Sequence, residues 1–216
     1  MRIACLHTAD SNIAVFENAA KDDAFAHVAL THTVRPDLLA QVEQGGFTAQ
    51  LENEVVAVLL ELAADADAVV LTCSSIGPAA ATAAAQTRIP VLRVDEALAH
   101  ATAKSGGRAI ALCAAPTTLE PTRILFDNAA QAENAIVEVR LVLTAWDLFK
   151  AGDRDGYLTM IAEAADRAFA EGFEIVALAQ ASMMVAADLC RAGRPLTSPG
   201  AGLRAAVTAG RAEMAV

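Results

Sequence analysis

Short apolar runs alternate with longer amphipathic segments along most of the chain. The apolar runs are rich in Val, Ile, Leu and Ala and occupy residues 2–7, 26–32, 68–73, 89–94, 110–113, 135–144 and 174–180. They lack strict apolar–polar alternation, which is typical of parallel strands covered on both faces. Segments with helical patterning separate them, at residues 36–46, 51–65, 78–86, 157–172 and 183–193. This order predicts an α/β fold with parallel sheets.

The second half of the chain repeats the pattern of the first. Ile3 coincides with Ile110 and Cys73 with Gln180 at one constant offset, and at that offset "ADADAVVL" lies over "EGFEIVAL". We therefore predict two pseudo-symmetric lobes, each a short parallel sheet flanked by helices, with a cleft between them. The first lobe is expected to span residues 1–100, with residues 200–216 packing back on it. The second lobe is expected to span residues 101–199.

Polar residues gather where the predicted strands end. In open α/β sheets, ligands bind beyond the carboxyl ends of the strands. Four segments lie at such ends, and we expect them to converge on the cleft. They are residues 7–12, 73–75, 116–118 and 180–182.

Cys73 is the residue with the most reactive chemistry in these segments. It follows an apolar strand and precedes a helix predicted to begin near Pro78, where unpaired N–H groups and the helix dipole favour a thiolate. A thiolate can take a proton from a carbon acid or act as a nucleophile. The competing interpretation is a small buried hydrophobe, which describes most cysteines. Cys5 and Cys113, inside strands, and Cys190, on a predicted helix, are expected to be core residues.

The remaining polar candidates each have two interpretations. Hydroxyl groups at helix N-termini are good caps, but their occurrence in both lobes equally suits carboxylate binding. The Asp-Ser pair after the first strand also suits a turn, and the strand-end histidine is either a proton shuttle or structural. These candidates are Ser74, Ser75, Ser182, Thr117, Thr118, Asp10, Ser11 and His7.

Composition and charge exclude several classes of partner. The net charge of −10 argues against a nucleic-acid or anionic-membrane surface, since both need basic patches. No apolar stretch approaches the ~20 residues of a membrane-spanning helix. The four cysteines are scattered, which favours reduced thiols, and the first residues lack the features of a signal peptide. We expect a cytoplasmic protein.

Familiar cofactor motifs are absent from the sequence. It contains neither G-x-G-x-x-G nor G-x-x-x-x-G-K-[ST], and no G-x-S-x-G for a serine hydrolase. The lysines Lys21, Lys104 and Lys150 lie in surface-like contexts, which does not suit a pyridoxal Schiff base. No spacing of His, Cys, Asp and Glu suggests a metal site. We therefore expect no cofactor and no metal, and either thiolate chemistry or binding alone.

Several stretches resemble the aspartate/glutamate racemase superfamily, which includes hydantoin racemases, maleate isomerases and arylmalonate decarboxylases. They are "LTCSS", "PTTLEPT", "FKAGDRDGYLTMIAEAADRAFAEGFEIVALAQASM" and "RPLTSPGAG", and the resemblance covers essentially the whole chain. It implies two cysteines facing each other across the substrate carbon, one removing a proton and the other returning it. It also implies a homodimer or higher homo-oligomer.

Carried onto this sequence, the resemblance makes Cys73 the first of the two cysteines. Ser74 and Ser75 then bind the substrate carboxylate, together with the loop that contains Thr117 and Thr118. Asp10 and Ser11 match an Asp-Ser pair of glutamate racemases.

The sequence departs from the family pattern at the second cysteine, where it has Gln180. A glutamine amide neither takes nor gives a proton at carbon near neutral pH, although it can hold a carboxylate or carbonyl by hydrogen bonds. Ala181 and Ser182 are expected to continue that oxygen-binding surface. Cys190 lies about two helical turns further on and cannot replace the missing thiol.

Three functions follow from this pattern. The first is a cofactor-independent, racemase-like isomerase acting on a small carboxylate-bearing carbon acid through a Cys73 thiolate. The alternatives are a decarboxylase-like lyase with one-sided protonation, and a non-catalytic protein that binds small carboxylates. The sequence does not rank amino acids, hydantoins and malonates as ligands.

Overall fold

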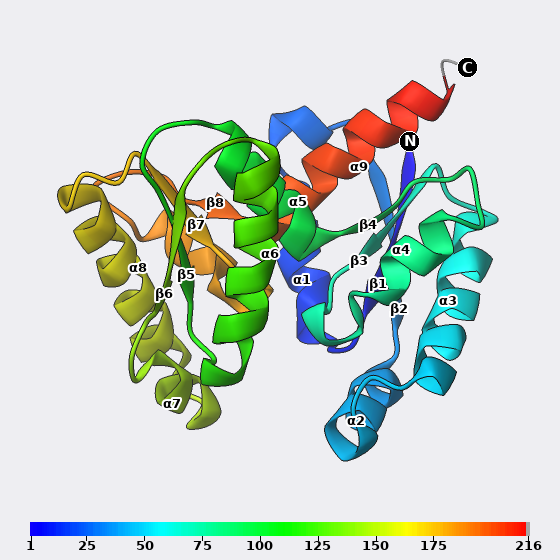
Figure 1. Cartoon of the computed structure of the whole chain (residues 1–216), viewed down its shortest axis with the longest axis horizontal. Helices are drawn as coiled ribbons and strands as arrows, with labels where there is room; N and C mark the ends of the chain where they lie inside the picture. The colour runs from blue at the N-terminus through cyan, green and yellow to red at the C-terminus, as the bar shows by residue number, and fades with distance from the viewer. Residues whose placement is uncertain (215–216) are drawn as a thin grey trace. The chain divides into compact units, whose positions relative to one another are not determined.

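The structure, a computed structural model, describes residues 1–214 of the chain. Its internal contacts divide the chain into two units, each with its own four-stranded parallel sheet (Figure 1). The first unit comprises Met1–Val94 and the segment that starts at Gly202, and the second comprises Asp95–Ala201. The predicted α/β class with two similar lobes is confirmed.

The first unit has the strand order β2-β1-β3-β4, with every neighbouring pair parallel. Its strands are β1 (Arg2–His7), β2 (Ala29–Val34), β3 (Ala68–Leu71) and β4 (Val91–Arg93). Its helices are α1 (Ser11–Ala19), α2 (Pro36–Gly45), α3 (Ala49–Ala63) and α4 (Ala79–Ala84), joined by most of α9 (Ser198–Met214).

Local sequence accounts for the elements of this unit. Pro36 begins α2, and the Thr48 hydroxyl accepts a hydrogen bond from the backbone N–H of Leu51 at 3.2 Å, which caps α3. The spacing of Leu51, Val55 and Leu59 puts all three on the face of α3 that packs into the core.

The second unit repeats this topology, with the strand order β6-β5-β7-β8. Its strands are β5 (Ala109–Cys113), β6 (Val137–Leu141), β7 (Ile175–Leu178) and β8 (Leu196–Thr197). Its helices are α5 (Val94–Lys104), α6 (Leu119–Ala132), α7 (Ala145–Lys150) and α8 (Arg154–Ala170). No helix among the described residues has both the length and the apolar character needed to cross a bilayer.

The helix predicted over residues 183–193 is wrong in type and in extent. A 3₁₀ helix, η4 (Ala181–Asp188), follows β7 instead, and Cys190 lies beyond it in irregular chain. The Asp166 carboxylate on α8 accepts hydrogen bonds from the backbone N–H groups of Arg191 and Ala192, at 2.9 and 2.8 Å. These N–H groups therefore bond to α8 rather than within a longer helix.

The internal repeat also needs a correction of one residue at the first strand of each unit. The carbonyl of Leu6 accepts a hydrogen bond from Thr72, and the equivalent bond in the second unit joins Leu112 to Ala179. Thr72 and Ala179 keep the offset of the sequence repeat, whereas Leu112 lies one residue before the position it predicts. The end of β1 at His7 therefore corresponds to Cys113.

Candidate functional site

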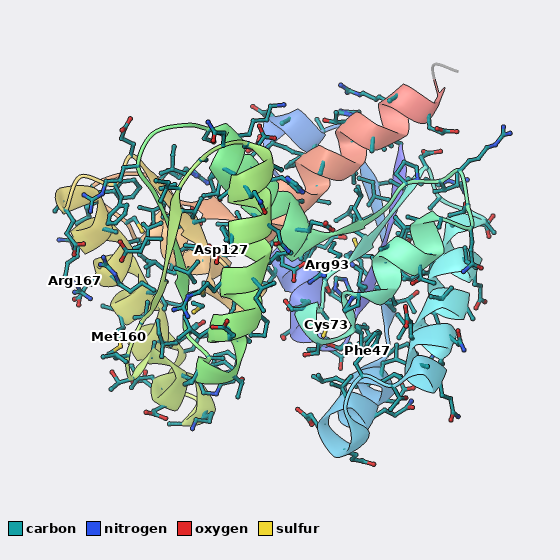
Figure 2. The ribbon with its side chains drawn as sticks, viewed as in Figure 1. Phe47, Cys73, Arg93, Asp127, Met160 and Arg167 are labelled. Atoms are coloured by element: carbon teal, nitrogen blue, oxygen red, sulfur yellow. The ribbon has the colours of Figure 1, made fainter. Side chains whose placement is uncertain are left out.

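Cys73 lies in the turn that follows β3, at the carboxyl edge of the first sheet (Figure 2). Its backbone is extended (φ −109°, ψ 118°), and its half-buried side chain packs against the core of this unit. Ser74 and Ser75 follow in a short 3₁₀ helix, η2 (Ser74–Ile76), with both side chains exposed. Neither hydroxyl hydrogen-bonds to another described residue, so neither caps a helix and both can meet a ligand.

The other three cysteines lie in environments that keep them protonated. Burial raises the pKa of Cys5 to about 12 and that of Cys113 to about 11. Burial and the nearby carboxylates also raise the pKa of Cys190 to about 11, and its thiol lies 3.2 Å from the carbonyl oxygen of Ala186. With no cation bound to them, these thiols stay protonated at neutral pH.

Arg93 is a neighbour of the Cys73 turn that the sequence did not reveal. A Cβ placed on Gly77 would lie 2.6 Å from the Cζ of Arg93, so the guanidinium rests directly on the backbone of this turn. Figure 2 labels Arg93 and Cys73 in this unit. Arg93 ends β4, and the carboxyl-end rule that selected the other segments would have found it if the fourth strand had been included.

The segment after β1 presents backbone donors at the same edge of the sheet. Asp10 precedes α1 without a side-chain cap, and both Asp10 and Ser11 are exposed. The backbone N–H groups of Thr8 and Ala9 donate to no acceptor within residues 1–214. Because Leu6 and Thr72 are hydrogen-bonded, this segment lies beside the residues that lead into Cys73.

His7 is fully buried, and both of its ring nitrogens have partners. Nδ1 lies 2.8 Å from the Thr72 hydroxyl, and Nε2 lies 2.9 Å from Nδ1 of His32, whose other nitrogen lies 3.0 Å from a Glu17 oxygen. Burial, followed by the charge of His32, lowers the pKa of His7 to about 4. The His7 ring is therefore neutral at physiological pH.

Gln180 takes the position after β7 that Cys73 takes after β3. Its backbone is similarly extended (φ −110°, ψ 141°), but its side-chain oxygen is already engaged. That oxygen accepts hydrogen bonds from the backbone N–H groups of Ala114 and Ala115, at 2.6 and 3.1 Å. These two amides correspond to those of Thr8 and Ala9, so the second unit fills with its own side chain a donor pair that the first unit leaves open.

The other candidates in the second unit are held by internal contacts to different degrees. The Ser182 hydroxyl lies 2.9 Å from that of Tyr157, a fully buried residue of α8 that the sequence analysis did not identify. The Thr118 hydroxyl donates to the carbonyl of Ala115 at 2.8 Å, and Thr117 is exposed. Ala181 begins η4 next to Gln180.

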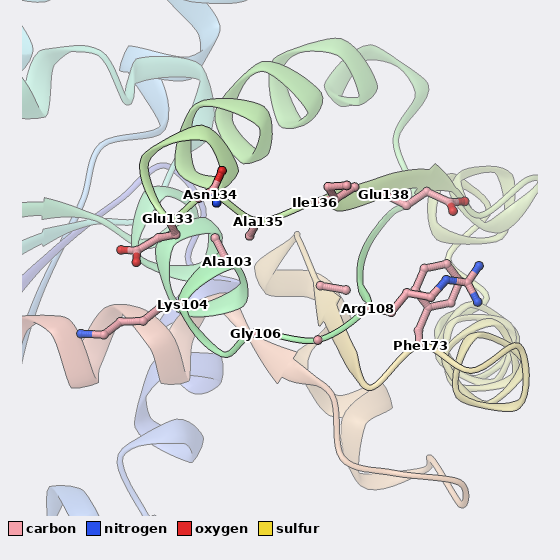
Figure 3. Close-up of a pocket in the computed structure, with 12 residues that line it drawn as sticks. Ala103, Lys104, Gly106, Arg108, Glu133, Asn134, Ala135, Ile136, Glu138 and Phe173 are labelled. Atoms are coloured by element: carbon pink, nitrogen blue, oxygen red, sulfur yellow. The ribbon is translucent and has the colours of Figure 1, made fainter.

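A separate pocket lies at the opposite end of the second sheet (Figure 3). It has a volume of about 630 Å³ and is lined by residues at the starts of β5 and β6, including Arg108, Ala109 and Ile136. None of the candidate residues lines it, so the pocket is distinct from the strand ends described above.

The structure is that of an α/β protein with two similar parallel-sheet units and a cysteine at the end of one strand. The sequence comparison identifies the family. Residues 5–206 match the family described as Asp/Glu/Hydantoin racemase, and the chain belongs to this family. Family membership supports an isomerase of the racemase type. None of the curated proteins compared with the chain matches it.

Solved structures of racemases share the fold over nearly the whole chain. The allantoin racemase from Pseudomonas fluorescens is 16% identical, with a TM-score of 0.68, over 98% of this chain and 92% of that one. The Picrophilus torridus aspartate racemase is 14% identical, also with a TM-score of 0.68, over 97% and 94%. The Thermus thermophilus glutamate racemase, in complex with β-chloro-D-alanine, is 17% identical with a TM-score of 0.65, over 99% and 81%.

Proposed function

We propose that the protein is a cofactor-independent isomerase that moves a proton at a carbon atom next to a carboxylate or similar carbonyl group. Cys73 is the acid/base residue: its thiolate takes the proton and leaves a planar enolate. Return of the proton from the Cys73 thiol regenerates the starting compound, whereas a proton delivered by water to the opposite face gives the isomer, after which the thiol loses its proton to solvent. The observation that carries this proposal is the placement of Cys73, half-buried in a strand-end turn with two uncommitted serine hydroxyls beside it.

The surroundings of Cys73 suit an anionic substrate. The Ser74 and Ser75 hydroxyls and the free N–H groups of Thr8 and Ala9 are donors, and the Arg93 guanidinium on the same turn adds a positive charge. Donors and cations of this kind stabilise the negative charge that develops when the proton leaves carbon. We assign Asp10 and Ser11 to the surroundings of the same substrate. His7 is buried with both ring nitrogens engaged, so we propose that it supports this strand end without contacting the substrate.

The second unit is proposed to contribute binding groups and no proton. Gln180 cannot act as an acid or base at carbon, and its oxygen is held by Ala114 and Ala115, which leaves only its NH₂ group as a donor to a substrate oxygen. Thr117, Thr118, Ala181 and Ser182 are the other proposed substrate contacts of this unit. A single thiol exchanges protons on one face of the substrate carbon, so deuterium exchange is expected to be faster than inversion.

The test is proton exchange in D₂O. The full chain is incubated with separate small carbon acids: aspartate, glutamate, allantoin, 5-substituted hydantoins and 2-substituted malonates. Deuterium incorporation is followed by NMR, and configuration by chiral chromatography. We expect exchange with at least one compound, and its loss in Cys73→Ala. Cys190→Ala is the matched control, because it removes a half-buried thiol elsewhere in the chain.

Three outcomes separate the candidate functions. Exchange that depends on Cys73 supports the isomerase. Release of CO₂ from a malonate with the same dependence points to the lyase instead. Binding of these compounds without exchange, equal in the wild type and Cys73→Ala, contradicts the proposal and favours a non-catalytic carboxylate-binding protein.

A further inference from the structure

Three side chains with metal-binding atoms lie together near the carboxyl ends of β1 and β2. Cys5 and His7 are two residues apart on β1, so they point to the same face of the sheet, and His32 on β2 is the register partner of Cys5. One ligand atom from each of the three lies within 4.8 Å of those of the other two. Strand pairing assembles this cluster, which is why sequence spacing indicated no metal.

The hydrogen bonds on the outer side of the two rings are compatible with a metal-binding tautomer of each. The Thr72 hydroxyl lies 3.0 Å from the carbonyl oxygen of Leu6 and 2.8 Å from Nδ1 of His7, so when it donates to the carbonyl it accepts from Nδ1. Nε2 of His32 faces an oxygen of Glu17 at 3.0 Å, and a carboxylate accepts hydrogen bonds. With Thr72 in that orientation, both outer nitrogens are donors.

In this tautomer, each of the two inner nitrogens has a lone pair that can bind a metal ion. Nε2 of His7 and Nδ1 of His32 face each other at 2.9 Å, and with the outer nitrogens protonated, two neutral rings would oppose lone pair to lone pair. A metal ion held by both nitrogens turns that opposition into two coordinate bonds, and it also uses the sulfur of Cys5. Without a metal ion, the Thr72 hydroxyl donates to Nδ1 of His7, and the His7 Nε2–H donates to His32.

We propose that Cys5, His7 and His32 form a binding site for a borderline-soft divalent metal ion of the Zn²⁺ type, with one coordination position left for a fourth ligand. Zn²⁺ is commonly bound by Cys and His together, at about 2.3 Å from sulfur and about 2.0–2.1 Å from nitrogen. Tetrahedral coordination puts two nitrogen ligands about 3.3 Å apart, so the rings need to separate by only a few tenths of an ångström.

The outer hydrogen bonds are those that metal-bound histidines generally make. A ligating histidine usually donates its second N–H to a carboxylate, carbonyl or other oxygen, which fixes its tautomer and orientation. Glu17 provides this contact for His32, and Thr72 provides it for His7. Thr72, which contacts His7, is the residue before Cys73 in the sequence. The proposed metal site nevertheless takes no part in the proposed proton transfer and does not depend on it.

The site would join three elements of the first unit. Cys5 and His7 belong to β1, His32 to β2, and Glu17 to α1. A metal ion that binds only the folded state stabilises it in proportion to the logarithm of its free concentration. The expected role is therefore structural, at the edge of the sheet from which the Cys73 turn emerges.

The test is metal binding to the full-length chain, freed of metal and kept reduced. Zn²⁺ is added and measured by equilibrium dialysis and by the melting temperature, and Co²⁺ is added as an absorbing probe for thiolate coordination. We expect one equivalent of Zn²⁺, a higher melting temperature, and a sulfur-to-Co²⁺ charge-transfer band. His32→Gln is expected to weaken Zn²⁺ binding by at least about 100-fold. The His32 side chain is only 12% exposed, and glutamine is chosen because it is polar and similar in size.

The controls use a histidine and a cysteine outside the cluster. His27→Gln and Cys190→Ala are expected to bind Zn²⁺ as the wild type does, whereas Cys5→Ala is expected to lose the charge-transfer band. Equal Zn²⁺ affinity in the wild type and His32→Gln would overturn the proposal, as would Co²⁺ binding without a thiolate band. No Zn²⁺ binding at all would overturn it as well and would leave the cluster as a chain of neutral hydrogen bonds. None of these measurements uses proton exchange at Cys73. The metal-site proposal can therefore be contradicted while the proposed function stands, and the proposed function can be contradicted while the metal site stands.

Discussion

The side-chain oxygen of Gln180 accepts a hydrogen bond from the backbone N–H of Ala114 at 2.6 Å, and a second from Ala115 at 3.1 Å. One side chain therefore satisfies two neighbouring amides where the chain leaves β5. Ala114 and Ala115 are both nearly inaccessible to solvent, so water cannot easily replace this acceptor.

Removing the acceptor should destabilise the chain. Gln180→Leu keeps much of the side-chain volume but leaves two buried N–H groups without a partner, which costs about 1–3 kcal/mol for each. We expect a lower midpoint in urea unfolding with an unchanged slope. Gln180→Glu retains an oxygen in the same place and should stay near the wild type. Equal stability of all three proteins would show that the two hydrogen bonds contribute nothing measurable.

Cys73 should react with iodoacetamide faster than the other three cysteines. Cys5 and Cys113 are inaccessible, and all three of the others have a pKa raised to about 11 or above, whereas Cys73 lies half-buried in an exposed turn. The rate at each residue is read by peptide mass spectrometry at short times. A ligand found in the exchange assay should protect Cys73. Uniform slow labelling of all four thiols would argue against a reactive residue.

Gly77→Ala should impair proton exchange while leaving the fold intact. Gly77 has a helical backbone (φ −52°, ψ −40°), so alanine is allowed there, but its Cβ would lie 2.6 Å from the Cζ of Arg93. The flexible guanidinium would move away from the Cys73 turn. If it binds the substrate, the loss of a charge-assisted contact lowers the exchange rate by about 10- to 100-fold.

Gly45→Ala is the matched control, because a Cβ at that position meets no atom within 4 Å. Both variants should unfold close to the wild-type midpoint, and only Gly77→Ala should lose activity. Full activity in Gly77→Ala would remove Arg93 from the proposed site.

The sequence predicts the elements best where the pattern is local. Residues 2–7 coincide with β1, and helix α2 begins at Pro36 as expected, because apolar clustering and proline act over a few residues. The strand predicted over residues 26–32 instead begins at Ala29, after a 3₁₀ turn at Asp23–Phe25 that the Asp22 side chain caps. The missed helix α1 has a short apolar face interrupted by polar residues, which gives a weak periodic signal.

The contacts of the candidate site depend on pairing between distant residues. The turn with Cys73 was predicted because a buried strand and a helix start flank it. The position of Arg93 on Gly77 and the hydrogen bonds from Ala114 to Gln180 depend on which strands are neighbours and in what register. The sequence repeat matched the two units correctly at β3 and β7. It misaligned their first strands, β1 and β5, by one residue. The cluster of Cys5, His7 and His32 was missed for the same reason.

Tyr157 offers a direct test of the core beneath Ser182. It is the chain's one tyrosine, so its ionisation can be followed by absorbance without interference from another. Burial raises the pKa of Tyr157, while the hydrogen bond with Ser182 and the charge of Arg154 act in the opposite direction. In the folded protein, the tyrosinate signal should therefore appear only above pH 10, the usual pKa of a tyrosine.

This shift gives the pH dependence of stability a definite sign. Below pH 10 the phenol is protonated in both states, and its contribution to stability is complete. Above pH 10 the unfolded state loses the proton first, so the free energy of unfolding should fall as the pH rises towards the folded pKa. Ser182→Ala removes a group that lowers the pKa and should move ionisation to still higher pH. Ionisation of the folded protein below pH 10 would mean that Tyr157 is solvated rather than packed in the core.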